Sequence, residues 1–237
     1  MFQHKKILIA FVALFVLAVS VPSWAAESEY SERVMNATNV LTEIMQIPEN
    51  GIPDELMERA VAVAVIPHMV KGAFGLGGTY GKGLVSHRGN DGKWSTPSFV
   101  EIGGGSVGLQ LGVQATDVVL VFTSHDGFKG LLDGKLKLGV DAGVAAGPVG
   151  RKAEAGTDVL LKSPVLSYSR SKGLFAGVSL EGAVVNIDDS ANRKVYGKKV
   201  TGNDVLLGNA VMMNDVVAPF VRALEKHSPS LKRTSLR

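Results

Sequence analysis

Two stretches of this sequence decide its fold class: KGAFGLGGTYGKGLV at residues 71–85 and EIGGGSVGLQLGV at residues 101–113. Both place glycines inside segments whose other residues are typical of β-strands. The chain holds 28 glycines in 237 residues, about 12% against a usual ~7%, and 20 of them lie between Lys71 and Gly150. Because interior glycine weakens an ordinary strand, this density indicates bulges, sharp coiling or close approach of two backbones. We therefore predict a small, strongly curved antiparallel sheet that closes, or nearly closes, like a barrel.

Hydrophobic periodicity predicts helices before and after this sheet. Apolar residues at Val34, Ala37, Leu41 and Ile44 follow helical spacing and predict an amphipathic helix over residues 28–46. Residues 61–66 form a continuous apolar run ended by Pro67, which favours a buried strand. The other expected elements are a short helix from residue 53, strands within 72–85, 98–114, 116–122 and 136–147, a helix at 124–133, a hairpin of 164–170 with 173–185, and helices at 188–196 and 203–226. The expected fold class is therefore α+β, with N-terminal and C-terminal helices.

Residues 1–25 have the features of a secretory signal peptide. Lys5 and Lys6 precede fifteen uncharged residues, 7–21, and Ser23 and Ala25 are small residues of the kind that a signal peptidase requires. A membrane anchor is the alternative, but fifteen apolar residues fall short of the ~20 that span a bilayer. We therefore expect cleavage near Ala25 and a mature protein that is periplasmic or secreted. Residues 26–59 would form an N-terminal helical segment, residues 60–226 the main domain and residues 227–237 a basic tail.

Composition excludes several classes of protein. The sequence has no cysteine, so it can form no disulfide scaffold, thiolate metal site or cysteine nucleophile. Without the leader it carries 23 basic and 22 acidic residues, a balance that does not favour nucleic-acid binding. The charge is unevenly divided, with a net −6 over residues 26–60 and a net +7 over residues 61–237. Attraction to an anionic surface must therefore come from the body of the domain or from the tail.

Short motifs that resemble catalytic signatures do not combine into an active site. Residues 103–108 match both G-x-G-x-x-G and G-x-S-x-G, but residues 109–114 alternate like a strand where either motif requires a helix. Ser124-His125-Asp126 contains the residue types of a catalytic triad, yet sequence neighbours rarely face one another, so a surface turn is favoured. No helical pair of metal-binding histidines is present in the mature sequence. We expect a protein that is not an enzyme and needs no metal or cofactor; a hydrolase with Ser106 as nucleophile is the catalytic alternative.

Nine sequence blocks carry a family resemblance. In chain order they are AVIP at 64–67, KGAFGLGG at 71–78, WSTP at 94–97, GGGS at 103–106, ATDVVL at 115–120, GKLKLG at 134–139, AAGPVGR at 145–151, YSRSKGLFAG at 168–177 and LEG at 180–182. Together they resemble the SYLF domain, a lipid-binding family found in bacteria and in eukaryotic actin-associated proteins. The resemblance covers about residues 60–200 and identifies residues 60–226 as a SYLF-like domain.

The resemblance implies lipid binding, but one feature of the family is missing. Eukaryotic members bind phosphoinositides largely through a basic amphipathic segment at the N-terminal edge of the domain, and some bind actin. In this chain the corresponding residues, 26–60, carry a net −6, which should repel an anionic membrane. The resemblance therefore implies only a general role in binding lipid at the cell envelope.

The candidate headgroup ligands are Lys71, Arg151, Arg170 and Lys172. Each lies in a family-like block beside glycine or serine, where backbone amides and a cation could together hold a phosphate. The alternative is that they are strand-end charges paired with carboxylates; the acids within otherwise apolar strands are Asp117, Asp141 and Glu181.

These observations predict a non-catalytic phospholipid-binding protein of the bacterial cell envelope. Its expected partner is an acidic phospholipid or the envelope membrane surface, and not a nucleic acid. The alternative is a structural or adaptor module that binds an envelope protein.

Overall fold

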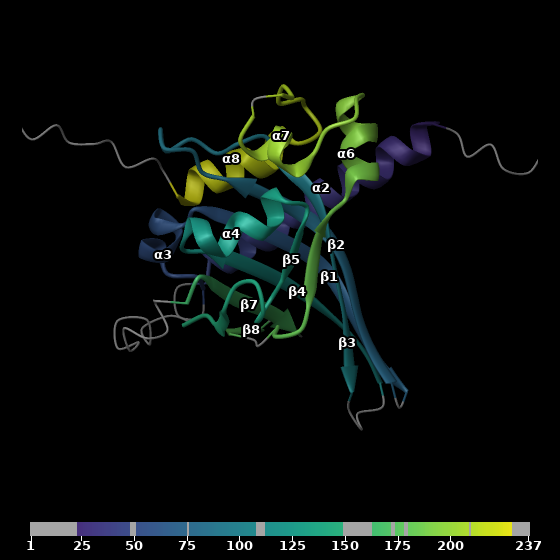
Figure 1. The fold of residues 1–237 in the computed structure, drawn as a ribbon, viewed down its shortest axis with the longest axis vertical. Helices are drawn as coiled ribbons and strands as arrows, with labels where there is room; N and C mark the ends of the chain where they lie inside the picture. Colours follow the sequence, from purple (N-terminus) through teal and green to yellow (C-terminus); the bar gives the residue numbers. More distant parts are fainter. Residues whose placement is uncertain are drawn as a thin grey trace, which may run out of the picture.

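A strongly curved sheet forms the centre of the molecule (Figure 1). The computed structural model describes residues 23–47, 51–74, 76–107, 112–148, 163–171, 174–177, 180–208 and 210–228. The strands are β1 (Ala62–Phe74), β2 (Leu76–His87), β3 (Ser98–Val107), β4 (Gly112–Phe122), β5 (Lys135–Lys137), β6 (Val144–Ala146), β7 (Val165–Ser171), β8 (Leu174–Gly177) and β9 (Val184–Ile187). Their order is β5-β9-β3-β2-β1-β4-β7-β6, and β8 pairs with β7. The sheet curls into a half-barrel, which confirms the predicted α+β class and the strong curvature.

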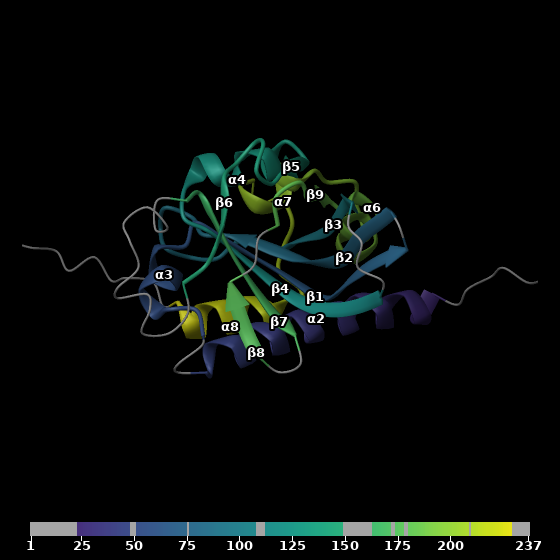
Figure 2. The ribbon, with the colours of Figure 1, turned by 90° about the horizontal axis from the view of Figure 1, so that it is seen from below.

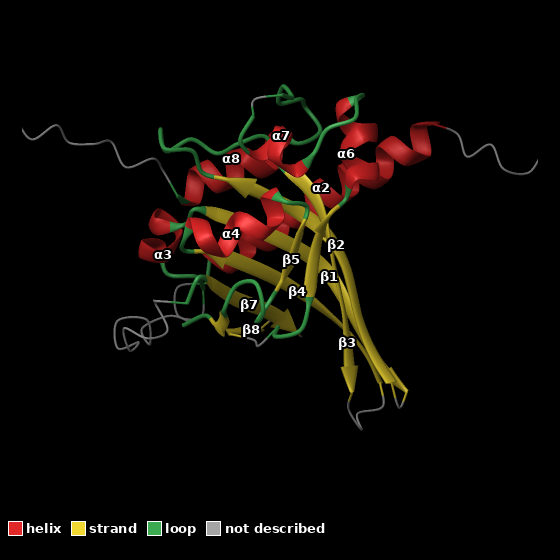
Figure 3. Cartoon of the chain, viewed as in Figure 1, coloured by secondary structure: helices red, strands yellow, loops and turns green. Residues whose placement is uncertain are grey.

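Helices cover both faces of this sheet (Figures 2 and 3). They are α2 (Ser23–Met45), α3 (Asp54–Arg59), α4 (His125–Leu132), α6 (Asp189–Tyr196), α7 (Gly202–Leu206) and α8 (Ala218–His227). Helices α2 and α8 pack on one face, and the side chains buried there, which we call the first core, include Leu41, Val65, Phe99, Tyr168 and Phe220. Helix α4 packs on the other face, and the second core includes Ile66, Leu120, Phe122, Phe128 and Leu131.

Strand β1 continues through the proline that was predicted to end it. The register of β1 shifts against β2 between Val65 and Val70, and against β4 between Ile66 and Met69. Pro67 therefore lies in a bulge, where its missing N–H breaks no regular ladder bond. The bulge also places His68 in the left-handed region, with φ of 49°.

Glycine makes room for this bulge on the neighbouring strand. A β-carbon at Gly83 of β2 would lie 2.0 Å from the carbonyl oxygen of Val65. No side chain can be accommodated at that distance, so the two backbones approach closely only because residue 83 is glycine. This close approach is one of the three explanations that the sequence offered for its interior glycines.

Several predicted boundaries were wrong. The segment expected as one strand over 98–114 contains β3 and the start of β4, because the end of β3 and the start of β4 have the same glycine-rich alternation. The single helix expected over 203–226 is α7 followed by α8, with Gly208 after the first helix and Pro219 in the first turn of the second. The predicted hairpin is confirmed for β7 and β8, but β9 leaves it and pairs with β3 and β5.

The predicted N-terminal helix, the helix at 124–133 and the helix at 188–196 are confirmed. Within the described part of the chain, no helix has the length and apolar character needed to cross a membrane.

Candidate functional site

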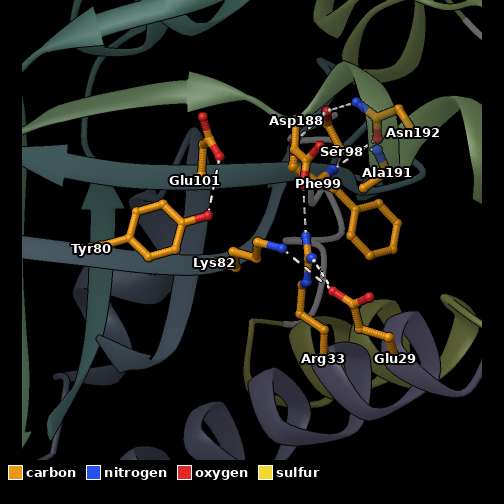
Figure 4. A network of polar contacts seen from close by, with 10 residues as sticks. All are labelled: Glu29, Arg33, Tyr80, Lys82, Ser98, Phe99, Glu101, Asp188, Ala191 and Asn192. Carbon is orange, nitrogen blue, oxygen red and sulfur yellow. Dashed lines mark hydrogen bonds and ion pairs between the residues drawn. The ribbon is translucent and has the colours of Figure 1, made fainter. Parts of the chain in front are cut away.

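An almost buried arginine fastens the N-terminal helix α2 to the body of the protein (Figure 4). Arg33 is 7% exposed, and its Nη1 donates to Asp188 Oδ2 at 3.0 Å. Its guanidinium also lies over the rings of Tyr30 and Phe99, at 5.5 Å and 5.4 Å from the two ring centroids. Asp188 in turn accepts the backbone N–H of Ala191 and so caps helix α6. One ion pair therefore joins α2, the sheet and α6.

Further ion pairs neutralise acids of α2 with bases of the sheet. Lys82 of β2 lies 3.4 Å from Glu29, and Arg170 of β7 contacts Glu43. Glu29 also lies 3.4 Å from Arg33 on the same helix. The acidic N-terminal segment and the basic body are thus complementary within one molecule, and part of the net −6 is compensated where α2 packs on the sheet.

Arg170, one of the predicted headgroup ligands, is engaged in this packing. Its Nη2 lies 2.6 Å from Asp117 Oδ2, its Nε donates to the same oxygen at 2.8 Å, and Nη1 contacts Glu43. The other oxygen of Asp117 accepts the backbone N–H of His68, at 2.9 Å, in the β1 bulge. Arg170 therefore holds the carboxylate that supports the bulge, which matches the alternative interpretation of a strand charge with acidic partners.

Lys71, a second predicted ligand, lies on the opposite face of the sheet from Arg170. It is two residues beyond Met69 of the second core, whereas Arg170 is two residues beyond Tyr168 of the first core. Because side chains alternate along a strand, the two cations point to opposite faces. Lys71 is exposed, and the described residues supply no carboxylate to pair with it. The structure does not bring these two candidates together, and Arg151 and Lys172 lie outside the described residues.

Lys71 stands at the base of a part of the sheet that we call the sheet extension. It consists of residues 71–74, 76–79, 104–107 and 112–114 of β1 to β4, beyond the row in which Val70 pairs with Tyr80 and Ala115, and Tyr80 with Gly103. In Figure 1 the ends of β1, β2 and β3 project away from all the helices. Lys71 is the one charged residue in the sheet extension, and the exposed ring of Tyr80 lies in the row at its base.

A cleft of about 810 Å³ lies elsewhere on the molecule and was not predicted. It is bordered by the connection from β2 to β3, by α4 and by the segment after α7. His87 stacks on Phe128 in this cleft, with ring centroids 5.2 Å apart, and lies 5.9 Å from His125. Burial and the neighbouring His125 lower the pKa of His87, while a hydrogen bond with the Leu206 backbone opposes the change. The residues come from separate segments, so no local sequence pattern could have revealed the cleft.

The two serines of the motifs that resemble catalytic signatures have structural roles. Ser124 is the N-cap of α4 and accepts the backbone N–H of Gly127, while His125 and Asp126 are exposed. Ser106 lies within β3 and pairs with Gly77 of β2, as the alternation predicted, and not on a turn into a helix. Among the residues that the structure describes, no three or more His, Asp or Glu side chains gather as a metal site.

Comparison with known proteins identifies the family. Residues 103–227, from β3 to the end of α8, match the model of the family described as "Ysc84: Las17-binding protein actin regulator". LAS seventeen-binding protein 3 of Saccharomyces cerevisiae is 37% identical over 180 residues, which cover 75% of this chain and 39% of the yeast protein. SH3 domain-containing YSC84-like protein 1 of Homo sapiens is 32% identical over 188 residues, covering 77% of this chain and 55% of the human protein. The chain thus spans about two-fifths to one-half of these relatives, and the name of the yeast relative describes a binding protein. It belongs to the Ysc84 family of SYLF-domain proteins.

Proposed function

We propose that this protein is a non-catalytic binding module that associates with acidic phospholipid at the surface of a bacterial envelope membrane. The observation that carries the proposal is Lys71, an exposed cation at the base of a sheet extension that none of the described helices covers. A lysine near an anionic membrane surface contributes about 1 kcal/mol of attraction. The membership of the chain in the Ysc84 family and the name of its yeast relative, LAS seventeen-binding protein 3, are consistent with a binding role.

The packing of α2 weakens the main objection to binding an anionic surface. As an isolated segment, residues 26–60 would repel acidic headgroups because of their net −6. In the folded protein Glu29 and Glu43 have basic partners on the sheet, and they lie on the face opposite to Lys71. Repulsion by these carboxylates is therefore partly compensated and is directed away from the proposed contact.

Of the four cations, Lys71 is our proposed headgroup contact. Arg151 and Lys172, in other blocks of the family resemblance, are further candidates. We assign Arg170 a supporting role because a headgroup would have to compete with Asp117 and Glu43 for its guanidinium. The same protein would act in the periplasm or outside the cell after cleavage near Ala25. Such a cleavage preserves the packed face of α2, whose first buried side chain among the described residues is Tyr30.

Vesicle flotation of the mature protein tests this function. We expect association with vesicles containing phosphatidylglycerol or cardiolipin at low salt, and loss of association as salt screens the charges. Lys71→Gln should weaken partitioning about fivefold, because one lysine contributes about 1 kcal/mol. Lys135→Gln removes another exposed lysine, from β5, and serves as the matched control. Absence of flotation at low salt would overturn the proposal.

A second candidate function is an adaptor that binds a protein of the envelope. It is favoured by large apolar side chains exposed near the cleft, at Leu207, Met212 and Met213, and by relatives that are named for binding a protein partner. This alternative predicts that lipid-free protein binds one partner at fixed stoichiometry and that Met212→Asp weakens the complex. A lipid requirement for that complex would count against it.

A further inference from the structure

We propose that the sheet extension inserts into the hydrocarbon region of one membrane leaflet, with Lys71 and Tyr80 at the level of the headgroups. This inference rests on the proposed lipid binding and adds to it which part of the chain leaves the water. In this proposal the acyl chains of the bilayer contact the strands of the sheet extension. Four observations support the inference: composition, dimensions, backbone pairing and the residues at the base.

The composition of the sheet extension suits an apolar environment. From residue 72 to residue 81, and again from residue 102 to residue 116, the chain has no Asp, Glu, Lys, Arg or His. The surface of a water-exposed sheet normally carries charged residues that keep it soluble and unaggregated. Their absence on strands that project from the body marks this region as one that contacts something apolar.

The dimensions match one leaflet. Phe74, the last described residue of β1, is four residues beyond Val70 in the row at the base, and Val107 is four residues beyond Gly103. At a rise of about 3.3 Å per residue these arms are about 13 Å long. Half of a hydrocarbon core of about 30 Å is about 15 Å, so the sheet extension can enter a leaflet without spanning the bilayer.

Backbone pairing permits insertion and limits its depth. Every residue of the sheet extension in β1 and β2 pairs with a neighbouring strand, so most N–H and C=O groups there are satisfied before any contact with lipid. Among the described strands, Gly104 to Val107 of β3 pair with β2 alone, and Gly112 and Val113 of β4 pair with β1 alone. Unpaired edge groups are costly in hydrocarbon, which favours entry of the tips over immersion of the whole sheet.

The residues at the base are suited to the interface. Tyr80 is 51% exposed, and tyrosine is enriched where headgroups meet the apolar core. Lys71 can place its amine among headgroups while its methylenes lie along the apolar strands. Two residues beyond Tyr80 along β2, Lys82 stands opposite Glu101 of β3 in the strand register. These two charged residues mark the level at which insertion stops.

The absence of cysteine allows a direct test with a single environment-sensitive label. Gly105 is exposed, and a β-carbon there would meet nothing within 4 Å, so Gly105→Cys should fold normally. The control is Met212→Cys, an 88% exposed position in the segment between α7 and α8. That segment lies at the opposite end of the molecule from the tips of β1 to β3 (Figure 1). Each protein is labelled with a nitrobenzoxadiazole fluorophore and mixed with phosphatidylglycerol vesicles that contain brominated acyl chains.

We expect a blue shift and quenching by brominated lipid for the label at residue 105, and neither change at residue 212. If both proteins float with the vesicles but the label at residue 105 stays in water, insertion is overturned while lipid binding stands. If neither floats, the proposed function itself fails, and insertion with it.

A charged substitution gives an independent check that does not depend on a label. Gly105→Glu should reduce partitioning into the vesicles about tenfold or more, whereas Gly105→Ala should leave it unchanged. Equal partitioning of the two variants at matched salt would overturn insertion. Their free energies of unfolding in solution should agree, because both side chains extend into open space.

Discussion

The ion pair between Arg33 and Asp188 offers a sharp test of how α2 is held. Arg33→Met keeps an apolar side chain of similar length and removes the guanidinium that bonds Asp188 at 3.0 Å. Asp188 is 13% exposed, so its carboxylate would lose its cationic partner in a largely buried position. The contacts of the guanidinium with the rings of Tyr30 and Phe99 would be lost as well.

The burial and hydrogen bonds of Asp188 determine how much the free energy of unfolding should fall. Removing one partner of a buried ion pair costs about 3–5 kcal/mol, and the low end applies because Asp188 keeps some contact with water and still accepts the N–H of Ala191. We therefore expect Arg33→Met to lower the free energy of unfolding by about 3 kcal/mol. Asp188→Asn should cost less, about 1–2 kcal/mol, because the amide oxygen can still cap α6 and Arg33 retains Glu29. The double variant should reveal a coupling energy of about 2 kcal/mol.

Denaturant unfolding of the mature protein and the three variants measures these values. Lys82→Met is the matched control, because its pair with Glu29 is exposed and should contribute about 0.5 kcal/mol or less. The reasoning is refuted if Arg33→Met is no more destabilising than Lys82→Met, or if the coupling energy falls below about 0.5 kcal/mol.

Further substitutions and conditions test other parts of the structure. Gly83→Ala should destabilise the protein by about 2 kcal/mol or more, because its β-carbon would overlap a carbonyl oxygen in the bulge. Gly105→Ala should be neutral or slightly stabilising, because its β-carbon would meet no other atom. Thermal unfolding of both variants distinguishes strain at residue 83 from a general effect of replacing glycine. Burial lowers the pKa of His87 and of His227, so both are neutral when folded and gain protons more readily when unfolded. Stability should therefore be full above pH ~6.5 and fall as the pH drops below it, and a denaturation midpoint that does not change between pH 7.5 and 5.5 would contradict this. Thr201→Ala removes the capping box of α7 and should cost about 1 kcal/mol in the same unfolding assay, and Thr201→Ser should restore most of it.

The fold class could be predicted because local patterns encode it. Helical spacing in residues 28–46 predicted α2, and the concentration of glycine predicted a strongly curved sheet; both are confirmed. The errors fall where consecutive strands have the same composition, as β3 and β4 do, or where apolar residues in the segment after α7 imitate helical spacing. Pro67 was wrongly taken as a strand end because sequence alone does not show that the ladder is interrupted there by a bulge.

The candidate site was less predictable, because a cation's role depends on what packs against it. Lys71 and Arg170 have similar sequence contexts, yet one is exposed and the other contacts two carboxylates. The partners of Arg170 come from α2 and from β4, which are distant from it in sequence. The unequal charge of residues 26–60 and 61–237 could be counted from the sequence, but the pairing of these charges across the interface of α2 with the sheet could not.

The sequence by itself determined which elements exist and what each is made of: a cysteine-free α+β chain, an acidic amphipathic helix, and glycine-rich strands with uncharged runs at residues 72–81 and 102–116. These properties are local, because periodicity and composition act within one element. Tertiary structure alone decided that α2 packs its acids against basic strands, that Lys71 and Arg170 face opposite sides, and that the uncharged strands project beyond the helices. Those outcomes depend on register, strand order and close approach of backbones, which join residues far apart in the chain.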